Sequence, residues 1–312
     1  MAATQVIPAV HTAAPRVCVG VPVYNGARYL RRALDALLAQ DWPALEVLVS
    51  DNASTDDSLA IAEWYAAIDS RVRVARFSAN AGLEANFSRV LAAADGAYFM
   101  WAACDDCWHP QFVRRMVEAL EGRPQAVVAM SAVERVNEAG RVVDVVRFRG
   151  ALDPSQMGSR EMAMKLAAGR PYHLFIYGLF RTSFIKQAFT GFAAVIGSDR
   201  LFMCRVAMAG GFAYVDEVLH RRLVRDTPIA ERYANEALGQ LWRGAWPRWR
   251  LALAAGPYLW SSPVMPASRR WWIPAIVARF MKASLGHTIL GAARSASFAK
   301  IAASTRDPRT RR

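Results

Sequence analysis

The stretch Ala97-Tyr-Phe-Met-Trp-Ala-Ala-Cys-Asp-Asp106 joins an apolar run, typical of a buried strand, to two adjacent carboxylates. Ligands bind at the carboxyl ends of strands in open α/β sheets, so acids there can hold a divalent cation and, through it, a diphosphate. Two loop acids, one of them capping a helix predicted to begin near Pro110, would have the same sequence. The stretch therefore predicts an α/β sheet, and the role of its acids depends on the neighbouring loops.

Three further strands, separated by helices, are predicted before this stretch. The nearly continuous apolar, β-branched run at 17–24 is typical of a strand buried on both faces of a parallel sheet, and further strands are predicted at 45–50 and 72–75. Leucines at helical spacing predict a helix ending at Gln40, and further helices are predicted over 57–68 and 83–94. Such alternation within about a hundred residues indicates βαβ units, and hence a doubly wound, mainly parallel sheet flanked by helices.

The loops after these strands carry polar residues that are expected to form one pocket. Right-handed crossovers bring the carboxyl ends of parallel strands to one edge of the sheet. That edge is predicted to hold Pro22, Tyr24, Asn25, Asp51, Asn80, Gly82, Asp105 and Asp106. Carboxylates and amides suit a base and a ribose, and the acid pair suits a metal. Neither a Gly-x-Gly-x-x-Gly loop nor a Walker loop follows the first strand, which argues against a dinucleotide-binding domain and a P-loop enzyme.

The second part of the chain mixes strands and helices. Predicted strands lie at 125–133, 175–180 and 212–219, and predicted helices at 108–121, 159–168 and 200–209. Asn137-Glu-Ala-Gly140 predicts the turn of a hairpin that follows the first of these strands. His220, Arg221 and Arg222 follow the last strand and could reach a diphosphate, or could equally be surface residues.

Charge and tryptophan are concentrated near the end of the 312-residue chain. Residues 1–239 carry 26 Lys and Arg and 25 Asp and Glu, whereas residues 240–312 carry 13 and 1. Six of the ten tryptophans lie from Trp242 onward, and the apolar run at 251–268 is too short and too interrupted by proline for a membrane-spanning helix. Aromatic and basic residues suit an anionic membrane interface, and they equally suit an accessory helical subdomain with a solvated basic face.

The cysteines and the N-terminus point to a cytoplasmic protein. Four cysteines are too few and too scattered for a disulfide framework. The first residues lack the basic and apolar regions of a secretory signal. We therefore expect a cytoplasmic location, at the inner face of the cell membrane if the basic tail binds lipid.

The loop motifs, taken in order and spacing, resemble those of the family 2 glycosyltransferases, which have the GT-A fold. The residues that carry the resemblance are Val21-Pro-Val-Tyr-Asn-Gly26, Asp51 to Asp56, Asn80-Ala-Gly82, Asp105-Asp106 before Trp108-His-Pro110, and Asp199 at the start of a helix. The resemblance covers residues 16–226. It implies transfer of a sugar, usually with inversion, from a nucleotide-diphosphate donor to a hydroxyl on a glycan or lipid-linked acceptor, with Mn²⁺ or Mg²⁺ as cofactor.

The same resemblance implies roles for individual residues. Pro22, Tyr24 and Asp51 would line the nucleoside site, and Asn25, Asn80 and Gly82 would complete nucleotide-sugar binding. Asp105 would contact the ribose side, Asp106 would ligate the metal, and Asp199 would be the general base. Two departures concern Ala103, where many members have Asp, and Ser198-Asp199, where the family usually has Glu-Asp. A Gln-x-x-Arg-Trp signature is absent, which favours an enzyme that adds one sugar at a time.

The expected organisation is an N-terminal extension (1–15), a GT-A domain (16–239) and a basic, Trp-rich C-terminal extension (240–312). The domain would comprise a nucleotide-binding half, about 16–132, and an acceptor half, about 133–239. Two other functions stay open: a nucleotidyltransferase on a similar sheet, and a nucleic-acid-binding protein that uses the basic tail. The second leaves the polar loops unexplained, so no nucleic acid is expected as a partner.

Overall fold

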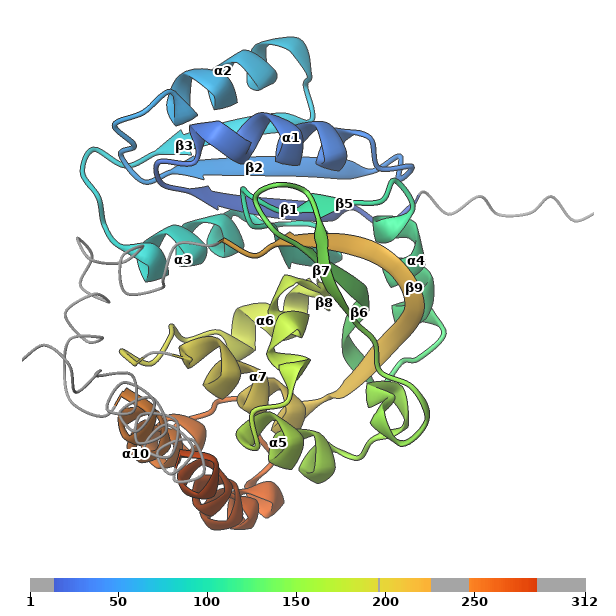
Figure 1. Ribbon diagram of the computed structural model, residues 1–312, viewed down its shortest axis with the longest axis vertical. Coiled ribbons are helices and arrows are strands. Elements are labelled where there is room, and N and C mark those ends of the chain that lie inside the picture. Colours follow the sequence, from blue (N-terminus) through green and yellow to red (C-terminus); the bar gives the residue numbers. More distant parts are fainter. Residues whose placement is uncertain (1–13, 196, 226–246, 285–312) are drawn as a thin grey trace, which may run out of the picture.

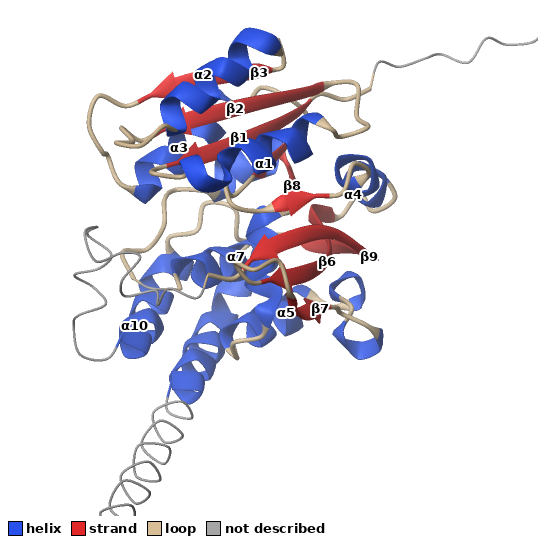
Figure 2. Ribbon diagram, turned by 45° about the horizontal axis from the view of Figure 1, so that its top comes forward, coloured by secondary structure: helices blue, strands red, loops and turns tan. Residues whose placement is uncertain are grey.

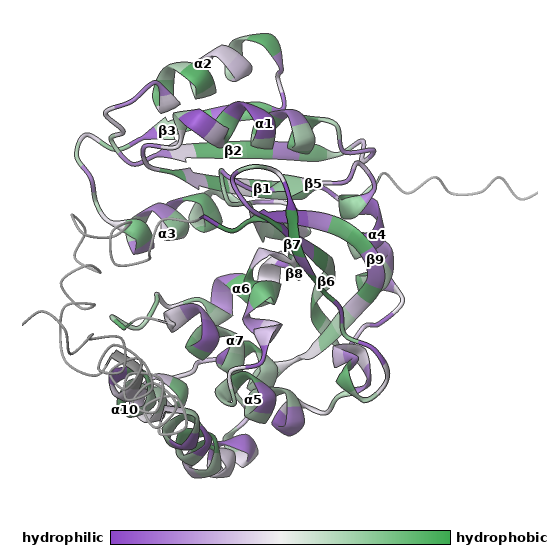
Figure 3. Cartoon of the chain, in the orientation of Figure 1, coloured by the Kyte–Doolittle hydropathy of each residue, from purple (hydrophilic) through white to green (hydrophobic). Residues whose placement is uncertain are grey.

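Four parallel strands form the first part of the sheet in the computed structural model, which describes residues 14–195, 197–225 and 247–284 (Figure 1). They are β1 (Val17–Val23), β2 (Leu45–Asp51), β3 (Val72–Arg76) and β4 (Tyr98–Trp101), in the spatial order β3-β2-β1-β4. Every residue of β2 and β4 is buried, as expected for strands covered on both faces, and β2 is largely green in Figure 3. The predicted parallel α/β sheet is confirmed.

Helices cover both faces of these strands. They are α1 (Ala27–Leu38), α2 (Ser58–Ile68), α3 (Leu83–Ala93) and α4 (Phe112–Glu121). In Figure 1, α1 and α2 lie on one side of β1 and β2, and α3 lies on the other. A Cβ atom at Gly20 would lie 2.6 Å from the Val90 side chain, so only glycine lets α3 pack this closely on β1.

The second part of the sheet is mixed. It contains β5 (Cys107–Trp108), β6 (Ala126–Val136), β7 (Val142–Val146), β8 (Leu179–Arg181) and β9 (Gly211–Leu223). β8 joins the two parts by pairing antiparallel to both β4 and β6. β6 pairs with β9 in parallel and with β7 in the predicted hairpin, and β9 also pairs with β5. The long curve of β9 thus brings its carboxyl end back beside the residues that follow β4 (Figure 1).

The strand predicted over 175–180 is wrong for most of its length. Residues Pro171–Tyr177 form a 3₁₀ helix, η3, and the strand that follows it, β8, begins only at Leu179. Gly178 separates the two, and a Cβ atom there would clash with the carbonyl oxygen of Ala129. Phe175 is fully buried all the same, because a short apolar run can be buried in either kind of element.

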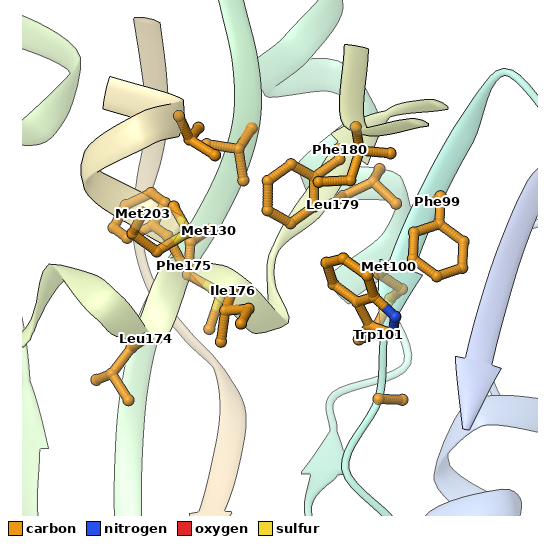
Figure 4. Close-up of a cluster of buried hydrophobic side chains, with 14 of the residues drawn as sticks. Phe99, Met100, Trp101, Met130, Leu174, Phe175, Ile176, Leu179, Phe180 and Met203 are labelled. Carbon is orange, nitrogen blue, oxygen red and sulfur yellow. The ribbon is translucent and has the colours of Figure 1, made fainter. Parts of the chain in front are cut away.

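Trp101, at the end of β4, lies in the aromatic core. Its ring packs edge-on against Phe99 at 5.1 Å and Phe189 at 5.1 Å between centroids, and Phe180 lies 6.1 Å away (Figure 4). Its Nε1 donates a hydrogen bond of 3.1 Å to the carbonyl oxygen of Phe87. The strand that leads to the acid pair is therefore held rigidly from several sides.

Helices gather at the far end of the molecule from α1 and α2 (Figures 1 and 2). They include α5 (Ser159–Ala167), α6 (Thr182–Ala188), α7 (Ser198–Ala209), α10 (Pro247–Trp260) and the short η1 (Gly150–Leu152), η2 (Pro154–Gln156) and η4 (Ala267–Trp272). Residues 273–284 are also helical. No helix in the described part of the chain is long and apolar enough to cross a membrane.

A buried arginine ties α10 to α7. Arg205 is 1% exposed, and its Nη2 donates to the carbonyl oxygen of Tyr258 at 2.6 Å while Nη1 donates to Oγ1 of Thr190 at 2.6 Å. The guanidinium also lies 3.8 Å from the centre of the Tyr258 ring. The described start of the basic C-terminal region therefore packs as part of the molecule's body. Residues 1–13, 226–246 and 285–312 lie outside the described residues.

Candidate active site

A cavity of about 440 Å³ lies at the carboxyl ends of β1, β2 and β4. Its lining residues, taken along the chain, are Pro22, Val23, Tyr24, Asn25, Asn52, Leu83, Asn86, Phe87, Ala103, Cys104, Asp105, Asp106, Tyr177, Arg222, Leu223 and Arg225. Five of the predicted site residues are among them, and they come from two of the predicted loops, those after β1 and β4. The remaining predicted residues, Asp51, Asn80, Gly82 and Asp199, are not in this lining.

The loop after β1 is joined to the loop after β2. Asn25 has a left-handed backbone with φ 49°, a conformation that asparagine tolerates better than most residues. Its Oδ1 accepts a hydrogen bond of 2.8 Å from the backbone N–H of Thr55, and its own N–H donates to Oγ of Ser54 at 3.0 Å. Tyr24 beside it is 38% exposed and lines the cavity. These contacts hold the first loop in place against the second.

The loop after β2 presents Asn52 to the cavity instead of Asp51. Nδ2 of Asn52 donates to Oδ1 of Asn80 at 2.8 Å and to the carbonyl oxygen of Gly82 at 3.2 Å. Its Oδ1 accepts from the backbone N–H of Ala81 at 2.9 Å. Asn80 and Gly82 are thus linked to the cavity through Asn52. The sequence pointed to this loop through Asp51, whereas the side chain that lines the cavity is that of Asn52, because successive side chains point in different directions.

Asp51 itself is buried just behind that loop, with 1% of its surface exposed. Its Oδ2 accepts a hydrogen bond of 3.1 Å from the backbone N–H of Ser54. Its buried Oδ1 has no hydrogen-bond partner among the residues described. An unsatisfied buried carboxylate oxygen costs free energy, so this atom is a candidate acceptor for a ligand N–H or O–H group.

Asn86 on α3 also lines the cavity, and its Nδ2 donates to the carbonyl oxygen of Val23 at 3.1 Å. Arg89, on the same helix, lies over the Phe77 ring at 3.2 Å. A structural role is therefore evident for both residues.

Asp106 is held on both oxygens by the end of β9. It is 2% exposed, with Oδ2 at 2.9 Å from Nε2 of His220 and Oδ1 accepting a 3.0 Å hydrogen bond from the backbone N–H of Leu223. His220 is stacked on Trp108, with ring centroids 5.5 Å apart. His220 therefore orients an acid, whereas the sequence suggested that it could reach a diphosphate.

Asp105 is more accessible and is paired with an arginine. Its Oδ2 accepts hydrogen bonds from Nε of Arg225 at 3.0 Å and from Nη2 of Arg225 at 2.7 Å. Burial and then the neighbouring negative charge of Asp106 raise the pKa of Asp105, and Arg225 opposes that rise. The two acids therefore form a concentrated negative charge at the cavity wall.

Arg222 adds a positive charge to the cavity beside these acids. Its guanidinium lies 5.0 Å from the centre of the Tyr177 ring, and its buried Nη1 has no hydrogen-bond partner in the described part of the chain. Burial raises the pKa of Tyr177, so that hydroxyl stays protonated. Arg221 points elsewhere: it is exposed and its Nε lies 2.6 Å from Oε2 of Glu134. Of the two adjacent arginines, only Arg222 is placed to contact a ligand.

Asp199 lies close enough to Tyr177 for its charge to act on that residue, but it does not line the cavity. It is the second residue of α7, after Gly197, whose φ of 83° favours glycine. The negative charge of Asp199 contributes to raising the pKa of Tyr177 and the pKa of Arg222, two residues that line the cavity. The sequence offered Arg222 as a residue that could reach a diphosphate, but it missed Tyr177 and Arg225, because no local pattern shows that the end of β9 returns to β4.

The acid pair is compatible with a cation that also binds phosphate oxygens. Such cations take one or two protein carboxylates and complete their shell with phosphate and water. Within the described ranges, the cluster of three potential ligand side chains lies elsewhere, at Cys18, Glu46 and Asp95. Those acids already pair with Arg16 and Arg73. The donor set at Asp105 and Asp106 thus fits a cation that arrives with a diphosphate.

Comparison with known proteins identifies the same family that the loop motifs resemble. Residues 18–189, more than half of the chain, match the model of glycosyl transferase family 2. The uncharacterized glycosyltransferase YibD of Escherichia coli (strain K12) is 25% identical over 232 residues, which are 72% of this chain and 66% of YibD. The uncharacterized glycosyltransferase RT0329 of Rickettsia typhi is 31% identical over 110 residues, 35% of this chain and 33% of RT0329. The chain thus spans less than two thirds of either relative.

Solved structures show the same fold. S. aureus TarS in complex with UDP-GlcNAc superposes with a TM-score of 0.62 at 17% identity, covering 86% of this chain and 73% of TarS. The mannosyltransferase PcManGT of Pyrobaculum calidifontis, in complex with GDP-Man and Mn²⁺, gives 0.52 at 21% identity, covering 93% and 81%. Identities this low support the fold alone, which is GT-A. With the family match, they show that the chain belongs to glycosyl transferase family 2.

Proposed function

We propose that the protein transfers a sugar, with inversion, from a nucleoside diphosphate donor to a hydroxyl group of a glycan or lipid-linked acceptor. The observation that carries this proposal is the placement of unsatisfied polar atoms around one cavity. A buried acceptor, Oδ1 of Asp51, lies behind the loops after β1 and β2, and a buried donor, Nη1 of Arg222, lies at the end of β9. A nucleoside supplies N–H and O–H donors, and a diphosphate supplies acceptors, so one ligand could satisfy both.

The nucleoside is proposed to lie over the loops after β1 and β2. Pro22, Tyr24 and Asn25 would form its walls, and Oδ1 of Asp51 and Oδ1 of Asn52 would accept hydrogen bonds from it. Asn80 and Gly82 would hold Asn52 in position. TarS and PcManGT, whose structures contain UDP-GlcNAc and GDP-Man, support a nucleotide-sugar donor for the shared fold. We therefore propose a nucleoside diphosphate sugar as the donor of this protein.

A divalent cation, Mn²⁺ or Mg²⁺, is proposed to bind at the acid pair. When bound, it stabilises negative charge on the departing diphosphate as a Lewis acid. Asp106, held by His220 and Leu223, would provide a fixed ligand, because each carboxylate oxygen keeps a second lone pair. Asp105 would add a second carboxylate and contact the ribose side. Arg222 would donate hydrogen bonds to the diphosphate oxygens.

Asp199 is proposed to be the general base that accepts the proton of the acceptor hydroxyl. Inversion requires the hydroxyl to attack the sugar from the face opposite the leaving diphosphate. Asp199 is in the first turn of α7, a helix that lies apart from β1 and β2 in Figure 1, and its charge acts on Tyr177 and Arg222 in the cavity lining. A carboxylate there can take the proton as the new glycosidic bond forms.

The function is tested by a thermal-shift panel of UDP-, GDP- and dTDP-sugars with and without Mn²⁺. A donor that binds the folded state raises the melting temperature by mass action. We expect one nucleotide to stabilise the protein, more strongly with Mn²⁺, and Asp106→Asn to lose the Mn²⁺-dependent part. If no nucleotide sugar raised the melting temperature with or without Mn²⁺, the proposed donor would be wrong.

We also propose that the protein works at the cytoplasmic face of an anionic membrane. Leu253 and Trp260 are 66% and 58% exposed on α10, and Trp271 is 86% exposed in η4. Arg270 lies over the Trp260 ring at 5.5 Å, and residues 247–284 contain six Lys and Arg and no acid. Exposed aromatic residues beside cations suit the lipid headgroup region.

Flotation with phosphatidylglycerol liposomes tests this attachment. Removing residues 240–312 would strip α10 from α7 and leave Arg205 without its Tyr258 partner, so substitutions are preferable to truncation. We expect the triple variant Leu253→Ser, Trp260→Ser, Trp271→Ser to float less than wild type, at an unchanged melting temperature. Equal flotation of the two would favour a purely accessory role for this region. We also propose that the chain is divided into an N-terminal extension (1–15), a GT-A domain (16–239) and a basic C-terminal extension (240–312).

A further inference from the structure

The two acids of the cavity are neutralised in different ways. Asp106 is almost fully buried and is held by a histidine ring and a backbone N–H. The Asp105 side chain is 19% exposed, and within the described residues it accepts hydrogen bonds from one side chain, that of Arg225. A long side chain can leave more easily than a backbone group in a strand. Asp105 is therefore the acid whose partner can change.

Arg225 lies at the edge of the cavity, where its guanidinium can turn. Its side chain is 29% exposed, and it lies 5.1 Å from the centre of the Tyr29 ring. The Tyr29 hydroxyl donates a hydrogen bond of 2.9 Å to Oε1 of Glu138, at the tip of the β6–β7 hairpin. Tyr29 is thus fixed as a flat support for the guanidinium, whichever anion that group binds.

We propose that Arg225 is an exchangeable counter-ion, which neutralises Asp105 in the ligand-free protein and turns to the diphosphate when a divalent cation takes its place on Asp105. The inference rests on the proposed function. A cation on Asp105 would repel the guanidinium, while the diphosphate offers the same pair of acceptor oxygens that a carboxylate offers. One arginine can therefore serve both states without leaving a charge unpaired.

This exchange couples the binding of the cation to that of the nucleotide. Without a nucleotide, a cation must displace Arg225 into a site where no anion receives it, so free cation binds weakly. With a diphosphate present, the displaced guanidinium gains a new partner, and the cation binds more tightly. Because such coupling is reciprocal, the cation must raise the affinity for the nucleotide by the same factor.

The test is Mn²⁺ binding, measured from the electron paramagnetic resonance signal of free Mn²⁺, with no nucleotide and with UDP or GDP. We expect Arg225→Gln to bind Mn²⁺ alone about tenfold more tightly than wild type, and to lose most of the gain that a nucleotide produces. Arg221→Gln is the matched control, because it removes the same charge from an exposed pair with Glu134. It should leave both affinities unchanged.

The pattern of affinities separates exchange from a general change in electrostatic field. A field effect would raise Mn²⁺ affinity equally with and without nucleotide, which would contradict the proposal, as would wild-type affinities in Arg225→Gln. If that variant proved unstable, Arg225→Lys, which keeps the charge but loses the two-bond fork, should show a smaller shift in the same direction. A wild-type protein that bound Mn²⁺ neither alone nor with UDP or GDP would overturn the metal site itself, and Arg225's role with it.

Discussion

The two sides of the cavity differ in the kind of polar atom they leave unsatisfied. On the nucleoside side, formed by the loops after β1 and β2, the buried atoms without a described partner include an acceptor, Oδ1 of Asp51, and Oδ1 of Asn86 on α3 adds a second acceptor. On the β9 side, formed by Tyr177, Arg222 and Arg225, they include a donor, Nη1 of Arg222. Buried polar groups normally have partners, so each side lacks the complementary part of one ligand. The difference predicts the orientation of a bound nucleoside diphosphate, with the nucleoside over the loops after β1 and β2 and the diphosphate at the β9 side.

The largest expected effect tests whether Asp199, whose charge acts on Tyr177 and Arg222 of the β9 side, is the general base. Asp199→Asn should lower turnover by about 10²–10⁴, because it removes the proposed general base, while donor affinity stays near that of wild type. Turnover and donor binding are measured on one preparation once an acceptor is known. Normal turnover would exclude Asp199 as the base. Joint loss of binding and turnover would instead move this residue to the nucleotide site.

The next effect tests the orientation of the donor directly. Arg222→Gln should weaken binding of the nucleoside diphosphate by about 10–100-fold, since hydrogen bonds to charged groups are worth about 1.5–3 kcal/mol. Binding of the matching nucleoside, which lacks phosphate, should change little. Calorimetry with UDP and uridine, or GDP and guanosine, measures both. Equal losses of affinity for the two ligands would contradict the assignment of the diphosphate to the β9 side.

A smaller loss of ligand affinity is expected from a substitution on the nucleoside side. Asp51→Asn replaces a carboxylate oxygen that is proposed to accept one ligand hydrogen bond, so affinity should fall by about tenfold. The loss should be the same for the nucleoside and for its diphosphate, because both carry the base and the ribose. A loss confined to the diphosphate would place Asp51 at the wrong end of the ligand. Melting curves of the variant check that β2 stays folded.

The smallest effect concerns a partly buried histidine in η3, four residues before Tyr177. Burial lowers the pKa of His173 below its usual 6.5, against an opposing effect of Asp199. The folded state then keeps His173 neutral, whereas the unfolded state takes up a proton below pH 6.5. Stability should therefore fall as the pH drops through that value, by at most about 1.4 kcal/mol per pH unit for this group.

Urea unfolding of wild type and His173→Gln at pH 7.5 and 5.5 measures this contribution. The variant should lose less stability than wild type over that interval, since the other titrating groups contribute equally to both. Parallel losses would mean that the pKa of His173 is the same in the folded and unfolded states, which would contradict the lowered pKa.

The sequence alone determined the first half of the sheet and the position of its functional edge. Strands buried on both faces are mainly apolar, so β1, β2 and β4 could be located from composition, and the residues at their ends followed from parallel topology. Asp105 and Asp106 could be placed at the cavity for this reason. The apolar run at Phe175 could not be assigned, because a short buried segment has the same composition in a strand and in a helix.

Only the tertiary structure decided which partner each acid has. Arg225 meets Asp105 across 120 residues of chain, and His220 meets Asp106 across 114. These contacts depend on the curve of β9 and its pairing with β5, a strand of two residues that no sequence pattern marks. Hydrophobic patterning specifies whether a residue is buried, whereas the partner of a buried charge is specified by the packing of segments that are distant in sequence.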